Sequence, residues 1–210
     1  MKMMKTLAAL PLLLIATGGS AQMYGSAVRT TLTEGDLSVL KGEKEVKLEF
    51  IYEGMMVGGF TDEAYQNKKQ KEHNEKEAGK GDTWKENWVG NREKLFHPKF
   101  TELFNDRLEG ALVGGQDKTD AKYTFIIRTT STEPGYNIGI SRVPASLNSS
   151  IQLVETANPG TVIAEMVISN CPGGNAMGFD YDTGGRIAEG YAKMGKELAA
   201  FLQKKVPIKK

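Results

Sequence analysis

This 210-residue sequence has very little histidine and cysteine and no large excess of either charge. It contains two histidines and one cysteine, which excludes an intramolecular disulfide framework and a multi-cysteine zinc site. Its 27 basic side chains are balanced by 26 acidic ones, which argues against a nucleic-acid binder that works through bulk positive charge. The carboxylates have no distinctive spacing, and no GxSxG or HExxH motif occurs. The sequence therefore predicts no catalytic residue, no metal site and no cofactor.

The first 21 residues have the pattern of a cleaved signal peptide. Lys2 and Lys5 precede the apolar run Leu7–Ile15, and the small residues 19–21 supply a cleavage site. This run is shorter than the roughly 20 residues of a spanning helix. We expect export to the periplasm or beyond the cell, with residues 22–210 as a single domain and no transmembrane segment after cleavage.

The lone thiol, Cys171, would then enter an oxidising compartment. A free cysteine is more often a small buried apolar residue than a reactive one. We expect burial, and an intermolecular disulfide is the alternative.

Alternation of apolar and polar residues predicts most of the strands. The period of two, together with Pro, Gly and Asn turns between segments, predicts strands over 46–52, 123–130, 136–143, 150–156 and 161–169. The last four follow one another closely, which favours an antiparallel meander. Residues 24–44 show little periodicity, and we expect them to wrap the surface with Leu37, Val39 and Leu40 as anchor.

Helical segments are indicated by charge and by 3.6-residue periodicity. Residues 62–94 are predicted to form a charged helical arm. Its first helix should end near Gly79 and be followed by a loop through Gly81, after which Trp84, Trp88 and Leu95 form an apolar stripe. Pro98 is expected to open a new helix with one apolar face. The clearest helix, over 187–201, is expected to be capped by Asp182 or Thr183.

These elements predict an α+β domain. Its mixed, mainly antiparallel sheet of about five strands should carry helices packed on one face, because both amphipathic helices need an apolar surface to cover. Residues 62–94 would form a charged arm or insertion.

Two groups of residues are candidate ligand contacts. Asp180, Asp182 and Arg186 lie in the glycine-rich stretch 173–186, before a helix N-terminus that can expose backbone N–H groups to an anion. Turn and cap roles for the aspartates are the alternative. Trp84 and Trp88 could stack on a sugar or peptide, whereas a pair one helical turn apart is more often part of a core.

Three segments together resemble a known family. They are GDLSVLKGEKEVKLEF (35–50), GDTWKENWVGNREKLFHPKFTELFN (81–105) and GRIAEGYAKMGKELAAFL (185–202). This set is similar to a family of uncharacterised exported proteins of Gram-negative, gut-type bacteria. The last segment, after a strand meander, also resembles envelope lipoprotein domains found near curli secretion and peptidoglycan-synthase activation, although the lipidated cysteine is lacking here. The resemblance implies a place in the cell envelope and brings no catalytic residue with it.

Three functions remain open. The first is a non-enzymatic, exported binding or accessory domain whose partner is an envelope protein or glycan. The second is a small-ligand binder or hydrolase that uses the loop 173–186. The third is a structural subunit that assembles through Cys171 or an exposed strand edge. The oligomeric state is not predicted.

Overall fold

A computed structural model describes residues 27–174 and 182–208 of the chain. The predicted signal peptide and Asp180 lie outside the described residues. Of the helices within them, none has the length and apolar character that a membrane crossing needs.

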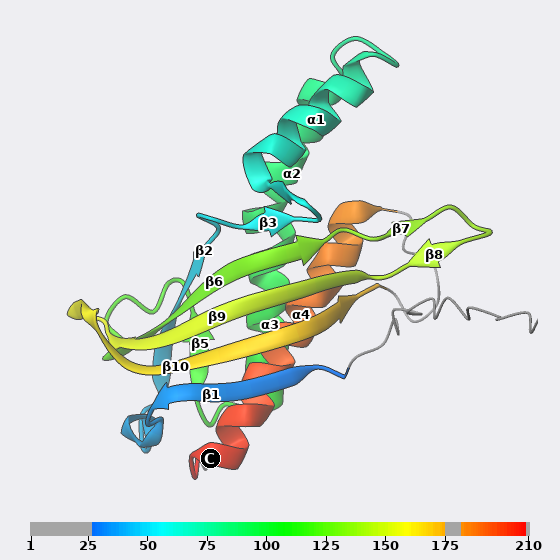
Figure 1. Cartoon of the computed structure of the whole chain (residues 1–210). Helices are drawn as coiled ribbons and strands as arrows, with labels where there is room; N and C mark the ends of the chain where they lie inside the picture. Colours follow the sequence, from blue (N-terminus) through cyan, green and yellow to red (C-terminus); the bar gives the residue numbers. More distant parts are fainter. Residues whose placement is uncertain (1–26, 175–181, 209–210) are drawn as a thin grey trace, which may run out of the picture.

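An eight-stranded mixed sheet forms the centre of the fold (Figure 1). Its main strand order is β1-β10-β9-β6-β2-β5, and β3 and β4 extend the β6 side of the sheet. Strands β1, β10, β9 and β6 pair antiparallel, whereas β2 runs parallel to β6 and β5. The bounds are β1 Arg29–Gly35, β2 Glu45–Ile51, β3 Met56–Val57, β4 Phe60–Thr61, β5 Val113–Gly115, β6 Tyr123–Glu133, β9 Ala145–Glu155 and β10 Asn158–Gly173.

Two long helices cover one face of this sheet. Helices α3 (His97–Leu108) and α4 (Thr183–Lys205) pack against each other and lie behind the sheet in Figure 1. In β9, buried residues alternate with half-buried ones from Ala145 onward, which is the pattern of a strand with a single covered face. A Cβ on Gly195 of α4 would lie 2.2 Å from the carbonyl oxygen of Phe100, so the close approach of the two helices requires glycine there.

The charged arm is a pair of helices that extends away from the sheet (Figure 1). Helix α1 spans Asp62–Asn74 and α2 spans Lys80–Asn91. Its inner end is attached through Asp62, which accepts a hydrogen bond from Trp88 Nε1 at 2.8 Å and pairs with Arg92. Helix α1 is a charged helix, as predicted, in which Gln66 is the buried residue, but it ends at Asn74 and not near Gly79.

The α+β class is confirmed, but the strand count of about five is wrong. Strands β1, β3, β4 and β5 were not expected. Strand β1 is an edge strand whose only aliphatic residue is Leu32, and β5 contains two glycines, so neither has the apolar alternation that marks a half-buried strand.

The predicted strand over 136–143 is also wrong. The chain forms instead a small separate two-stranded sheet, β7 (Tyr136–Asn137) and β8 (Arg142–Val143), so that β6 pairs directly with β9. The meander is therefore β6-β9-β10, and the β7–β8 hairpin projects from it (Figure 1).

The arm and the turn that follows it also differ from the prediction at Gly81 and Leu95. Gly81 lies inside α2 and not in a loop. A Cβ there would lie 2.0 Å from the carbonyl oxygen of Gln70, so the contact between the two helices requires glycine at this position. Leu95 is 36% exposed and Phe96 is buried in its place. A π-helical turn, Arg92–Phe96, joins α2 to α3 and inserts an extra residue, which rotates the apolar stripe by one position. Pro98 lies in the first turn of α3, as predicted, and α3 follows the π-helical turn directly.

Candidate basic pocket

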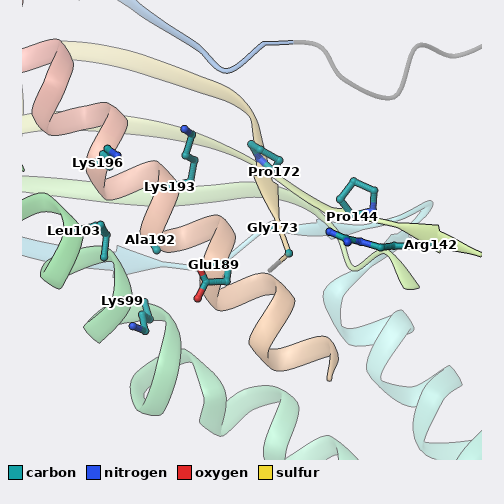
Figure 2. Close-up of a pocket in the computed structure, with 11 residues that line it drawn as sticks. Lys99, Leu103, Arg142, Pro144, Pro172, Gly173, Glu189, Ala192, Lys193 and Lys196 are labelled. Carbon is teal, nitrogen blue, oxygen red and sulfur yellow. The ribbon is translucent and has the colours of Figure 1, made fainter. Parts of the chain in front are cut away.

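A basic pocket opens between α3, α4 and the ends of β8 and β10 (Figure 2). Its volume is about 390 Å³, within the size range of small-ligand sites. Four of its lining side chains are cationic and one is acidic. The lining consists of Lys99, Leu103, Arg142, Pro144, Pro172, Gly173, Gly174, Glu189, Ala192, Lys193 and Lys196.

Helical spacing explains why α4 presents three charged residues to this pocket. Glu189, Lys193 and Lys196 are separated by four and three residues, so they project from the same side of the helix. Lys99 of α3 faces them across the helix pair, and Arg142 approaches from β8 (Figure 2). The cations therefore come from three elements that are far apart in the sequence.

Two of the lysines are already partly neutralised by their own helices. Lys99 Nζ lies 3.0 Å from Glu102, and Lys193 Nζ lies 3.4 Å from Glu197. The hydrogen bond to Glu102, with the attraction of the same carboxylate, raises the pKa of Lys99, so this lysine is charged throughout the physiological range. Within the part of the chain that the structure describes, Lys196 makes no ion pair. Lys196 is therefore the lysine best placed to meet an added anion.

The candidates of the glycine-rich stretch have other contacts. Asp182, one of the two predicted caps, is the N-cap of α4, and its carboxylate accepts a hydrogen bond from the Gly185 amide at 2.6 Å. Arg186 is 2% exposed and donates to the carbonyl oxygens of Pro134 and Gly135, each at 3.2 Å. Neither residue belongs to the described lining of the basic pocket. In the structure Asp182 therefore caps a helix and Arg186 supports the chain before β7. A ligand role for either residue stays a prediction.

The tryptophan pair stands between the core and the surface. Trp88 is 8% exposed and belongs to the hydrophobic core, in line with the core interpretation. Trp84 is half-buried and stacks on Trp88 with ring centroids 5.4 Å apart. It also borders a shallow hollow of about 600 Å³ on the arm, together with His73 and Asn87. Stacking of Trp84 on a ligand therefore also stays a prediction.

Cys171 and His97 are buried, and neither belongs to the described lining of the basic pocket. Cys171 is fully buried, which confirms the expectation, and burial raises the pKa of its thiol to about 12. Burial lowers the pKa of His97 to about 4, where its ring stacks on Phe50 and its Nε2 lies 3.0 Å from the Tyr52 hydroxyl. A thiol with so high a pKa is a poor nucleophile at neutral pH. In the two described segments, no group of three metal-binding side chains is placed to hold an ion.

Sequence reasoning missed the four cations of the pocket. Helical spacing on α4 could have grouped Lys193 with Lys196, because that signal is local. The approach of Lys99 and Arg142 depends on how α3 and the β7–β8 hairpin are placed, and no local pattern carries that information.

Comparisons with known proteins add little to this geometry. No family model and no curated protein matches the chain. Among solved structures, the chain resembles the PelC dodecamer from Paraburkholderia phytofirmans with a TM-score of 0.36 and 10% identity, over 81% of this chain and 97% of that one. A PelC variant from the same organism gives a TM-score of 0.35 and 13% identity, over 81% of this chain and 98% of that one. Both TM-scores are too low to carry an argument, so the resemblance to exported envelope proteins stays a prediction.

Proposed function

We propose that this chain is an exported, non-enzymatic binding domain of the cell envelope whose basic pocket holds an anionic ligand. The observation that carries the proposal is that Lys99, Arg142, Lys193 and Lys196 line one hollow, with Glu189 as the carboxylate among its described lining residues. Elsewhere the charges of the chain are balanced, so this concentration of one sign is local.

Electrostatics favours an anion that reaches several of these cations at once. Two unit charges about 4 Å apart attract by about 4 kcal/mol at the effective dielectric of a protein surface, and the attraction is weakened by salt. Lys196 supplies a cation that no described carboxylate neutralises. Glu189 repels negative charge but can accept hydrogen bonds from hydroxyl groups of a ligand. The pocket therefore favours a ligand that has both anionic groups and hydroxyl groups, such as an acidic saccharide.

A charge reversal with a matched control tests the pocket. Binding of inorganic pyrophosphate and of a uronic-acid oligosaccharide would be measured by titration calorimetry at low salt. Lys196→Glu should weaken binding about tenfold or more, because one attraction becomes a repulsion. Lys204→Glu makes the same change in net charge at the exposed C-terminal end of α4 and should leave binding within about twofold.

The two ligands separate the two sources of negative charge. Tighter binding of the saccharide supports an envelope glycan as ligand, and tighter binding of pyrophosphate supports a phosphate group. Equal losses in Lys196→Glu and Lys204→Glu would mean that bulk charge and not the pocket binds the anion. That result, or no binding of either ligand to the parent chain, would overturn the proposal.

A further inference from the structure

The β7–β8 hairpin presents apolar side chains to solvent at its tip. Ile140 is 96% exposed, Ile138 is 64% exposed and Tyr136 is 44% exposed. Figure 1 shows this hairpin projecting past the end of the main sheet. Single exposed apolar residues are common in proteins, but two aliphatic side chains and an aromatic one within five residues on a projecting turn mark an interaction site.

Hydrogen bonds hold the tip in one shape. The Ile138 amide donates to the carbonyl of Ser141 at 3.0 Å, and the Gly139 amide donates to the side chain of Asn137 at 3.0 Å. The hydroxyl groups of Tyr136 and Ser141 lie 3.1 Å apart across the turn. The apolar side chains are therefore displayed by an ordered hairpin, which lowers the entropy cost of using them in binding.

The base of the hairpin is fixed by a buried cation. The Arg186 guanidinium reaches from α4 to the carbonyl oxygens of Pro134 and Gly135, immediately before β7. Gly135 has φ +61°, and a Cβ there would lie 2.3 Å from the carbonyl oxygen of Val143. Burial of a guanidinium is costly unless carbonyl groups or anions satisfy it, so these contacts couple the direction of the hairpin to the helix that carries Lys193 and Lys196.

The basic pocket lies at the base of this apolar tip. Arg142 of β8 lines the pocket on the hairpin side, and Lys99, Lys193 and Lys196 line it on the side of α3 and α4 (Figure 2). Apolar side chains that project beyond a group of cations are characteristic of proteins that bind the interface of anionic membranes. A bilayer also accepts an isolated aliphatic tip without a shape-matched groove, whereas a protein partner has to supply one.

We propose that the β7–β8 hairpin inserts Ile138 and Ile140 into the interface of a bilayer that contains anionic lipids. Arg142 and the lysines of the basic pocket then face the phosphate headgroups. The electrostatic half of this inference rests on the proposed anion-binding pocket, and the apolar half rests on the tip alone.

Vesicle binding of matched variants tests the insertion. The chain would be purified from the exported fraction and sedimented with phosphatidylglycerol-containing vesicles or with phosphatidylcholine vesicles. The double variant Ile138→Ser with Ile140→Ser should reduce partitioning onto the anionic vesicles about tenfold or more, because two exposed aliphatic side chains lose their gain from leaving water. Val162→Ser is the control: Val162 is 44% exposed and belongs to β10 near its turn with β9, at the opposite end of the sheet, so partitioning should stay unchanged.

A tryptophan at the tip reports on insertion directly. With anionic vesicles, the emission of Ile140→Trp should shift to the blue and be quenched by brominated lipids, beyond the changes seen in the parent chain with Trp84 and Trp88. An unshifted Ile140→Trp, or equal partitioning of the parent and the serine double variant, would overturn the inference. A loss of self-association in the double variant without any vesicle effect would also overturn it, since a second copy would then be the occupant.

The pyrophosphate titration separates this inference from the proposed function. If the parent chain binds no soluble anion but Ile140→Trp inserts into vesicles, the proposed pocket fails and the insertion stands. If pyrophosphate binds in the pocket and the tip stays in water, the pocket stands and the insertion fails.

Discussion

The two helix pairs of this chain differ in how much of their surface is buried and in which interactions hold them. The α3–α4 pair covers the sheet with fully buried aromatic and aliphatic side chains such as Phe100, Phe104 and Leu198. The α1–α2 pair extends from the sheet and carries exposed ion pairs, among them Glu77–Lys80 at 3.0 Å. Full burial holds the first pair in place, whereas the second is held by half-buried aromatic contacts between Tyr65 and the two tryptophans and by an attachment at Asp62. We therefore expect the two helix pairs to contribute very different amounts to the free energy of unfolding.

The largest effect should come from the centre of the α3–α4 pair. Phe100→Ala removes a fully buried ring that packs edge-on against Phe50, and should lower the free energy of unfolding by about 3–5 kcal/mol. Urea denaturation followed by circular dichroism measures this. Val89→Ala, at a residue 44% exposed on α2, should change the value by under about 0.5 kcal/mol. A small effect at Phe100 would mean that the helix pair tolerates the cavity and that the comparison is wrong.

The next largest effect should be a pH dependence of the free energy of unfolding that comes from His97 at the start of α3. The folded-state pKa of His97 is lowered from 6.5 to about 4 by burial, so between these values the unfolded chain binds a proton that the folded chain does not. The free energy of unfolding should therefore fall as the pH decreases through this window, by up to about 3 kcal/mol from His97 alone. The stability is fully present above pH 6.5 and lost toward pH 4.

His97→Gln isolates this contribution because it removes the titrating group and keeps a side chain that can bond to Tyr52. The parent should lose more stability than the variant between neutral pH and pH about 4 in urea denaturation, whatever the carboxylates contribute to both. Parallel pH profiles of the two proteins would show that His97 titrates normally and lies less buried than its surroundings indicate.

The smallest effect should come from the arm. Glu77→Ala breaks the ion pair with Lys80, whose side chains are 68% and 60% exposed, and should cost under about 0.5 kcal/mol. The same denaturation assay, repeated at high salt, should give an even smaller difference because the pair is screened. A loss comparable to that of Phe100→Ala would show that the arm is part of the cooperative core.

Sequence reasoning succeeded where a segment carries its own pattern. Strand β2 and helix α4 were predicted from their periods of 2 and 3.6, and the Asp182 cap was found because N-cap chemistry is local. It failed for β1, whose residues gain their place only by pairing with β10. It also failed at Leu95, where the π-helical turn changed the phase of the stripe without any mark in composition.

The candidate site shows the same division more sharply. The glycine-rich stretch drew attention to Arg186, which the structure places under the β7–β8 hairpin as a buried support. The pocket lies beside that support and uses lysines that looked like ordinary surface charges on their helices. A helical pattern determines which side chains share a face, but it contains no information on which other element that face meets.

By itself, the sequence determined the α+β class, and it favoured a charged arm and a buried Cys171, since these follow from local periodicity, charge density and composition. Only the tertiary structure decided that four cations meet in one pocket and that an ordered hairpin displays two isoleucines beside it. The physical reason is the distance along the chain over which each kind of interaction acts. Propensity, capping and amphipathic period act over a few residues, whereas the meeting of Lys99, Arg142 and Lys196 is set by sheet order and helix packing across the whole domain.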